Sequence, residues 1–563
     1  MTAPADLAFV NGAVYAVDPA RPRAQAVAVR DGRIVIVGSD DDVRELLGSS
    51  TDVIDLKGRM LLPGFQDAHV HPPSSGLEML RCNLSNAYSL PDYRRIVAEY
   101  AAGHPDEPWI LGGGWSMDVF PGGNPPKDEL DTVVTDRPVY LTSRDGHSAW
   151  VNSKALEIAG VTRDVPDPED GVIVRAAGEV WGTLHEGAMR LVGKLVPEDT
   201  DEDWIAGLRV AQEYLHSLGI TAWQDAIVGI DDAYRTSDAY RTFEAYLRFE
   251  REGELTARVI GALWWDRHRG GEQIDDLLAA RERGRAGRFA ATSVKIMQDG
   301  VVENFTAGML EPYLDADGNP TDNRGKSFVD PEELKAHVTR LDAEGFQVHV
   351  HALGERAVRE ALDAIEQARR TNGMNDLRHH LAHLQVVNPN DVPRFRELGV
   401  VANAQPLWAQ NEGQMINLTI PFLGPERSGW QYPFGSLARA GATLAFGSDW
   451  SVSSPNPLEE MHVAVNRTGF PDQTYAPNSE TTDDPFLPEE AVDLPTAIEA
   501  FTRGSAYVNH LDDVTGSIES GKLADLVVVD RDLFAHPVTE LYAAKVELTL
   551  IEGERVYAAE NFA

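Results

Sequence analysis

Two closely spaced histidines, His69 and His71, are the sharpest chemical feature of this sequence. They end an apolar run, residues 63–71, whose composition is typical of a β-strand. On a strand, residues i and i+2 point to the same face, so both imidazoles can face one ion. A single pair of this kind is more often two hydrogen-bonded histidines at a strand end. The pair therefore indicates a metal site only if other ligands join it.

Further candidate ligands follow at the ends of similar apolar runs. They are, in chain order, His349 with His351, the cluster of His379, His380 and His383, and Asp449 after Phe446-Gly447-Ser448. Imidazole nitrogens and carboxylate oxygens suit zinc and similar divalent ions. Cys82 is the only cysteine, which excludes a disulfide framework and a cysteine-rich metal site.

These candidate ligands need a scaffold that brings distant segments together. Short apolar runs alternate with helical patterns, as in sheets built from βα units. The expected strands cover residues 65–71, 220–225, 258–263, 293–297, 347–351, 380–384, 400–405 and 444–449. Eight parallel strands close a TIM-type barrel, in which the C-terminal ends of all strands meet at one face. We therefore predict an α/β fold with a (β/α)8 TIM-like barrel and the histidines and Asp449 at that face.

The sequence pattern at both ends of the chain differs from that of the central part, because short apolar runs alternate there with turn residues. Residues 7–10, 13–17, 26–30 and 34–37 are expected to form a small antiparallel sheet, punctuated by Asn-Gly and Asp-Gly turns. Similar short runs return at 516–530 and 545–551. We predict one β-sandwich from residues 1–62 and 505–563, and a barrel from residues 63–504. An insertion at about 73–217 is expected to form a lid subdomain, with a turn at 112–115 and a strand at 139–142.

Charge and composition limit the partners of the protein. The sequence has 89 acidic and 50 basic residues, a formal net charge of -39. A nucleic acid or an anionic membrane would be repelled, so neither is expected as a partner. No run approaches the roughly 20 apolar residues of a membrane helix. The start of the sequence lacks the pattern of a secretory signal, and we expect a cytoplasmic protein.

Several motifs together resemble the amidohydrolase superfamily. They are Pro63-Gly64-Phe65-x-Asp67-x-His69-x-His71, the strand with Lys295, His351 before Ala-Leu-Gly, His383 before Leu-Gln, Gly447-Ser448-Asp449, and the closing stretch at 516–530. Residues 295–306 and 145–152 resemble the amidohydrolase 3 branch that includes N-substituted formamide deformylases.

The resemblance implies a role for each matching residue. It makes His69 and His71 ligands of a more buried metal, and His351 and His383 ligands of a second. Lys295 would bridge the two after carboxylation by carbon dioxide, and Asp449 would be a ligand and the proton acceptor. The expected cofactor is one or two divalent ions per chain, with zinc the first choice.

Lys295 can also be judged from its surroundings. An ammonium group beside divalent cations would be repelled, whereas a carbamate is anionic and has two oxygens for two ions. The alternative is a surface lysine in an ion pair. The flanking residues Val294, Ile296 and Met297 have the composition of a buried strand and favour the ligand role.

The resemblance implies hydrolysis of a small-molecule amide. A hydroxide held between two metals would attack the carbonyl carbon, and Asp449 would pass its proton to the leaving nitrogen. Deformylation of an N-substituted formamide to an amine and formate is the first expectation. Hydrolysis of another N-acyl group, a carbamate or a cyclic amide, and deamination, are alternatives on the same scaffold. A catalytically inactive binding or assembly module is an alternative of another class. We also expect a homo-oligomer, with a dimer as the first choice.

Other residues could shape the site. The resemblance places His147 there as a third catalytic residue beside Asp449 and Lys295. Its role, and that of Glu186, would be to polarise the carbonyl, bind the leaving group or hold the lid; a solvated helix face is an equal alternative for Glu186. His349, His379 and His380 are expected to have supporting roles. Four tryptophans next to the motifs either wall a pocket or belong to ordinary core: Trp115, Trp150, Trp408 and Trp450.

Overall fold

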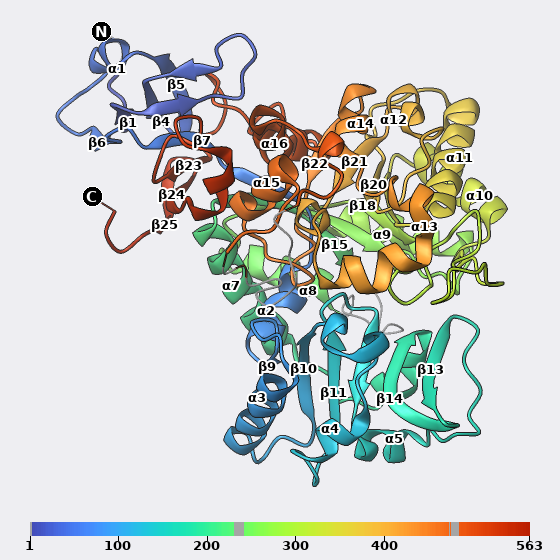
Figure 1. The fold of residues 1–563 in the computed structure, drawn as a ribbon. Coiled ribbons are helices and arrows are strands. Elements are labelled where there is room, and N and C mark those ends of the chain that lie inside the picture. Colours follow the sequence, from blue (N-terminus) through green and yellow to red (C-terminus); the bar gives the residue numbers. More distant parts are fainter. Residues whose placement is uncertain (1–2, 230–240, 472, 474–483, 563) are drawn as a thin grey trace.

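A computed structural model describes residues 3–229, 241–471, 473 and 484–562 (Figure 1). Its centre is a barrel of eight parallel strands with helices outside. The strands pair in chain order from β8 to β22. They are β8 (Phe65–Val70), β15 (Ile220–Val228), β16 (Arg258–Trp264), β18 (Phe289–Met297), β19 (Gln347–Ala352), β20 (His380–His383), β21 (Val401–Ala404) and β22 (Leu444–Phe446). The short strand β17 (Arg285–Ala286) pairs with β18 from outside this order. The predicted TIM-like barrel is confirmed, and each expected strand has its counterpart.

The barrel nearly closes between β8 and the segment that follows β22. The backbone N–H of Asp449 donates to the His69 carbonyl at 2.8 Å, and that of His71 donates to the Trp450 carbonyl at 3.1 Å. The buried Asp67 carboxylate accepts the hydroxyl of Ser448 at 2.6 Å. These contacts join the first and last strands where the candidate ligands lie.

Gly447 is needed at this seam because the two segments pass very close to each other. A Cβ atom on Gly447 would lie 2.5 Å from the backbone nitrogen of His69 and 2.8 Å from Oδ1 of Asp67. Any larger residue would push the first and last strands apart.

The outer helices follow their local sequence signals. Thr200 and Asp203 form a capping box at the start of the helix that begins with Asp201, and Asp330 caps the helix that begins with Pro331. Apolar residues face the strands, as Ala361, Leu362 and Ile365 do in the longest of these helices. The helices around the barrel are α7 (Asp201–Ser217), α8 (Thr242–Arg251), α9 (Ile274–Arg283), α10 (Pro331–Ala343), α11 (Glu355–Asn372), α12 (Val392–Leu398), α13 (Ile420–Ser428), α14 (Phe434–Arg439), α15 (Pro457–Asn466), α16 (Leu494–Glu499) and α17 (Ser505–Val508).

Strands from both chain ends form two facing sheets (Figure 1, upper left). One has the order β5 (Arg33–Gly38), β4 (Ala26–Arg30), β1 (Leu7–Val10), β6 (Asp52–Asp55). The other has the order β25 (Glu554–Ala558), β24 (Val546–Ile551), β23 (Leu526–Val529), β7 (Met60–Pro63), β2 (Ala13–Tyr15), β3 (Arg23–Ala24). Phe9 and Val27 of the first sheet share a buried core with Val528 and Leu548 of the second.

The expectation of one purely antiparallel N-terminal sheet is wrong. Strand β1 pairs with β6 in parallel, and β2 leaves this sheet to pair with β7, also in parallel. The reason is that β7 leads directly into the barrel and pairs with β23, so β2 joins the sheet that contains strands from both chain ends, whereas the other sheet consists of N-terminal strands alone.

The segment between β8 and β15 carries its own sheet, seen below the barrel in Figure 1. Its strand order is β13 (Gly171–Ala176), β14 (Glu179–Glu186), β12 (Ser148–Val151), β11 (Val139–Ser143), β10 (Ile110–Trp115), β9 (Cys82–Asn83). The accompanying helices are α2 (Pro72–Met79), α3 (Leu90–Gly103), α4 (Lys127–Asp131), α5 (Ser153–Ala159) and α6 (Arg190–Gly193). The turn expected at 112–115 is wrong, because these residues complete β10 between β9 and β11.

Within the described ranges, none of the helices combines the length and the apolar character that crossing a bilayer requires.

Candidate active site

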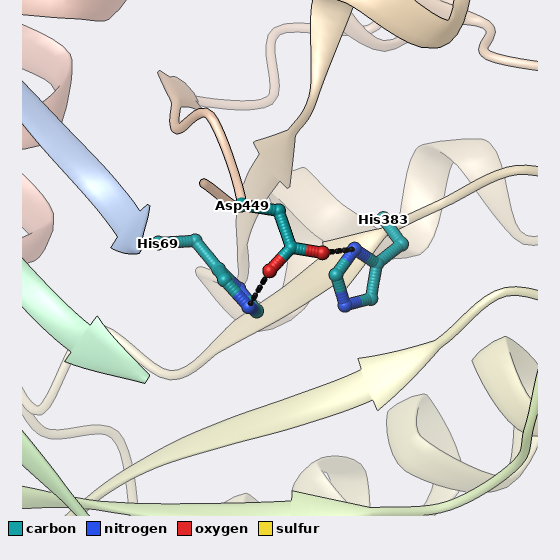
Figure 2. Close-up of side chains that lie close together, drawn as sticks. All are labelled: His69, His383 and Asp449. Carbon is teal, nitrogen blue, oxygen red and sulfur yellow. Dashed lines mark ion pairs between the residues drawn. The ribbon is translucent and has the colours of Figure 1, made fainter. Parts of the chain in front are cut away.

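Asp449 is the centre of a cluster of side chains at the C-terminal face of the barrel. Its Oδ1 atom lies 2.8 Å from Nε2 of His71 and 3.2 Å from Nε2 of His69. Its Oδ2 atom lies 3.8 Å from Nδ1 of His383. Figure 2 shows the carboxylate directed between His69 and His383. One ligand atom from each of these three residues lies within 4.8 Å of the other two, so all three can contact one ion.

His351 and Lys295 extend this cluster on two sides. The ring centre of His351 lies 4.5 Å from that of His383. The Nζ atom of Lys295 lies 3.3 Å from Nε2 of His69. Strand β19 positions His351, and β18 positions Lys295. The structure therefore brings all six predicted ligands into one contiguous group, although they come from five separate stretches of sequence.

Burial and neighbouring charges set the protonation state of each of these groups. Burial raises the pKa of the Asp449 carboxyl, but the neighbouring His69, His71 and His383 lower it more. This pKa therefore lies well below its usual value. Burial lowers the pKa of His69 to about 3, and the charge of Lys295 acts in the same direction. The cluster thus presents an ionised carboxylate and a neutral imidazole, the forms that bind metals.

Lys295 is buried, with 1% of its surface exposed, so the alternative of a surface ion-pair lysine is wrong. Burial lowers the pKa of its amine to about 7, although the Asp449 and Asp225 carboxylates raise it. Within the described residues, no carboxylate oxygen lies within ion-pair distance of Nζ; its one hydrogen-bond partner is His69. An amine in this setting loses its proton easily.

The other histidines lie behind the cluster. His349 contacts Nδ1 of His69 through Nε2 at 2.9 Å, and its own Nδ1 contacts Gln224 at 2.8 Å. The Nδ1 atom of His380 accepts from the Asn403 amide at 3.1 Å. His379 faces away from the site, with Nε2 2.9 Å from Asp342 of α10. The contact of His349 with Nδ1 of His69 fixes the orientation of the His69 ring.

His147 and Glu186 enter the site from the inserted sheet. His147 lies in the turn between β11 and β12, and its ring centre is 5.5 Å from that of His351. Its Nδ1 atom lies 2.9 Å from Oε1 of Glu186, which also accepts from Asn304 at 3.1 Å and from Thr306 at 3.0 Å. The solvated-helix alternative for Glu186 is wrong, because it ends strand β14 and its side chain is 6% exposed.

A pocket opens above the cluster. His147, His351, His383 and Asp449 line it. Two of the four tryptophans singled out in the sequence, Trp115 and Trp408, also line it, and Trp408 stacks on His383 with ring centres 5.4 Å apart. Trp150 packs against Trp115 and Phe120 in the core of the insertion, and Trp450 packs against Tyr214.

Several residues of the site were not recognised in the sequence. Asp67 accepts from the backbone N–H of His69 at 2.9 Å as well as from Ser448. Asp299 lies 3.3 Å from Nδ1 of His351 and accepts from the N–H groups of Leu353 and Gly354. Both lie inside the quoted motifs, so their proximity to ligands was a usable signal. The pocket residue Glu303 lies in the same quoted stretch, 295–306, whereas Glu412 had no such signal in its type or spacing.

The donor atoms fit a divalent ion. Four buried imidazole nitrogens make no hydrogen bond in the described part of the chain, and three of them belong to predicted ligands: Nδ1 of His71, His351 and His383; the fourth is Nε2 of His380. A buried polar atom without a partner costs free energy, and coordination of a metal ion would give each of the three ligand nitrogens a partner. The neighbouring donors are imidazole nitrogen and carboxylate oxygen, which zinc and related ions accept.

Comparison with known proteins assigns the chain to a family. A model of the amidohydrolase family matches residues 52–557. Protein LONG AFTER FAR-RED 3 from Arabidopsis thaliana is 31% identical over 98% of this chain and 92% of its own. An N-substituted formamide deformylase from Arthrobacter pascens is 27% identical over 98% of each chain.

A solved structure agrees. An uncharacterized metal-dependent hydrolase from Pyrococcus furiosus aligns with a TM-score of 0.68 at 27% identity, over 93% of this chain and 99% of its own. The match to the family model and the full-length relatives lead to one conclusion. The chain belongs to the amidohydrolase family and is a hydrolase of the metal-dependent amidohydrolase superfamily.

Proposed function

We propose that the protein hydrolyses the C–N bond of N-substituted formamides with the help of one or two divalent ions. The observation that carries this proposal is the contact of Asp449 with His69, His71 and His383 at the floor of a pocket. His69, His71, His351, His383, Asp449 and Lys295 would hold the metal. Zinc is the first choice because nitrogen and oxygen donors dominate the set.

A bound divalent ion would lower the pKa of water and polarise the carbonyl oxygen of the substrate. The residues of the chain then accept and donate the protons of the reaction. The oxygen of water bonds to the formyl carbon, and Asp449 takes the proton released from that water. When the C–N bond breaks, Asp449 returns this proton to the leaving nitrogen, so that amide and water become amine and formic acid. The low pKa of Asp449 keeps its carboxyl group ionised, which is the form that can accept a proton.

We also propose that Lys295 carries a carbamate. Its amine lies at hydrogen-bond distance from His69 and, within the described residues, has no carboxylate counter-ion within ion-pair distance. An uncharged amine adds to carbon dioxide and releases one proton, which converts a repelled cation into an anion with two oxygens. This change would let Lys295 join the other donors.

His147 is proposed to contact the substrate directly. It lines the pocket next to His351, and Glu186 holds its Nδ1 atom so that the rest of the ring faces the pocket. Glu186 raises the pKa of His147 against the effect of burial, to about 9. A protonated imidazole at this position can donate a hydrogen bond to the carbonyl oxygen as negative charge develops there.

The choice of a formamide rests on the full-length similarity to the Arthrobacter pascens enzyme. The test is to incubate the metal-loaded protein with N-benzylformamide, N-benzylacetamide and adenosine, and to quantify formate, acetate and ammonia. We expect formate from the first compound alone. Acetate or ammonia as the main product would instead assign another N-acyl hydrolysis or a deamination. Absence of all three products would leave hydrolysis of a carbamate or a cyclic amide, or an inactive binding module, as the alternatives.

Two further expectations accompany this function. A homodimer is proposed and can be tested by light scattering on the purified protein. A cytoplasmic location stays a prediction from the sequence.

A further inference from the structure

The pocket combines an apolar wall with carboxylates that the proposed hydrolysis does not use. Trp115, Met117, Trp408 and Met415 provide large apolar or aromatic surfaces. Glu303 and Glu412 line the same pocket. An apolar wall suits the hydrocarbon arm of a substituted amine. Two glutamates within this wall need a separate explanation, because an acidic group in an apolar pocket is costly unless something pairs with it.

Glu303 is surrounded by neutral donors. Its Oε1 atom accepts from the amide of Gln385 at 3.0 Å and from the hydroxyl of Thr419 at 2.8 Å. In the described part of the chain it forms no ion pair. Burial raises its pKa, because its charge is poorly solvated. A carboxylate in this situation gains more from a cationic neighbour than one that already has a counter-ion.

Glu412 has the same character and is 6% exposed. Its Oε1 and Oε2 atoms accept the backbone N–H groups of Met415 and Gln414, each at 2.8 Å. Again, no basic side chain of the described residues forms an ion pair with it. Burial and the nearby Asp118 raise its pKa. The two glutamates thus hold their places through neutral hydrogen bonds, and neither has a cationic partner among the residues that the structure describes.

The basic groups at the pocket are directed to other partners. The Arg144 guanidinium donates to the Ser85 carbonyl and stacks over the Tyr88 ring at 4.4 Å. His147 is paired with Glu186. Neither forms an ion pair with Glu303 or Glu412.

An independent feature points to a ligand that donates hydrogen bonds. Gln385 lines the pocket and is 1% exposed. Its Nε2 atom donates to Glu303, but its buried Oε1 atom has no hydrogen-bond partner among the described residues. An acceptor left without a partner in a buried position is costly, and a donor on a bound ligand would satisfy it.

We propose that this pocket selects amides whose leaving amine carries an apolar arm ending in a cationic nitrogen, and that Glu303, Glu412 and Gln385 recognise this nitrogen. The apolar arm would lie against Trp115, Met117 and Met415. Substrates with a carboxylate on the arm would be rejected, because they would bring a further buried negative charge beside the two glutamates. This inference rests on the proposed function, since it describes the leaving group of that reaction.

Three related formamides test the inference with the metal-loaded protein. They are N-benzylformamide and its derivatives with an aminomethyl or a carboxyl group at the para position. We expect kcat/KM of the ammonium compound to exceed that of the neutral parent by about tenfold, and that of the carboxylate to fall about tenfold below it. Equal values for the three, or a preference for the carboxylate, would overturn the inference.

Two variants test whether Glu303 and Glu412 cause the preference for the ammonium compound. Glu303→Gln and Glu412→Gln should each reduce the ratio of ammonium to carboxylate kcat/KM by about tenfold. Glu355→Gln is the matched control, because Glu355 is also a buried glutamate but does not line the pocket, and its ratio should equal that of the wild type. A full ratio in both pocket variants would contradict the assignment even if either variant lost activity overall.

Failure of the proposed function can be told apart from failure of this inference. If none of the three formamides releases formate, deformylation is wrong, and the amines themselves become the probes. Calorimetric titration then compares 1,4-bis(aminomethyl)benzene, benzylamine and 4-(aminomethyl)benzoate. We expect the diamine to bind about tenfold more tightly than the benzoate. Equal affinities, or no binding by any of them, would remove the inference.

Discussion

Asp449 and His71 are 378 residues apart in the chain, and Oδ1 of one lies 2.8 Å from Nε2 of the other. The contact exists because β8 and the segment after β22 meet where the barrel closes. Asp449 has a positive φ of 54° there, a backbone conformation that residues other than glycine adopt rarely. Closure of the barrel and assembly of the site are therefore one structural event.

Replacing Asp449 by Asn should separate catalysis from metal binding. The amide keeps the shape and one oxygen donor but cannot take a proton, so kcat should fall by about 10²- to 10⁴-fold. Metal content, measured by mass spectrometry, should fall much less. Asp315→Asn, in an exposed turn, is the control and should change neither quantity. Loss of metal with full activity in the remaining loaded fraction would show that the proton acceptor is another group.

Replacing Lys295 by Ala should reduce both metal content and activity, because the buried amine is the proposed source of the bridging carbamate. Lys335→Ala, on the outer face of α10, is the control. In addition, wild-type protein loaded with metal in buffer stripped of carbon dioxide should be less active than protein loaded with bicarbonate. If Lys295→Ala retained full metal and full activity, the bridged two-metal arrangement would be wrong.

The His147 and Glu186 pair should make stability depend on pH. Burial opposes charge on both, but each stabilises the other: the pKa of His147 rises from 6.5 to about 9, and that of Glu186 falls from 4.5 to about 2. The histidine contribution is full below pH 6.5 and is lost as the pH rises through about 9. The glutamate contribution is full above pH 4.5 and is lost as the pH falls through about 2.

Glu186→Gln should therefore lower the Tm more at pH 6 than at pH 10, relative to the wild type at each pH. Glu157→Gln, an exposed residue of α5, should show no such difference. The same Tm deficit for Glu186→Gln at both values would mean that the pair is not charged as assigned.

Gly447→Ala should damage both the fold and the site. The new Cβ atom would meet the His69 nitrogen at 2.5 Å, and forced overpacking of this kind costs about 1–3 kcal/mol. We expect a lower Tm and a lower metal content. Gly103→Ala is the matched control, since its Cβ would meet nothing within 4 Å at the end of α3. An unchanged Tm for Gly447→Ala would show that the seam is looser than described.

Features set by local periodicity could be predicted from the sequence. The eight barrel strands were recognisable because each is a short apolar run bounded by helical patterns, and the ligands His69, His351 and His383 stand at their ends. The convergence of these residues follows from barrel geometry alone.

Features set by long-range pairing could not be predicted. The parallel pairing of β2 with β7 joins residues 47 apart in the sequence, Ala13 with Met60 and Val14 with Leu61, and no local signal encodes it. The glycines at 112–114 suggested a turn, but β10 uses them because a Cβ on Gly112 would lie 2.1 Å from the Cys82 carbonyl oxygen. The Glu186 partners Asn304 and Thr306 lie more than 100 residues away, so its burial was equally hidden.

Metal content of wild-type protein purified without chelator tests the central claim most directly. The account predicts about one to two equivalents of a divalent ion per chain, lost with activity on chelation and restored with it on addition of zinc. Less than about half an equivalent, with no gain in metal or activity when zinc is supplied, would contradict the assignment of His69, His71, His351, His383, Asp449 and Lys295 as a metal site.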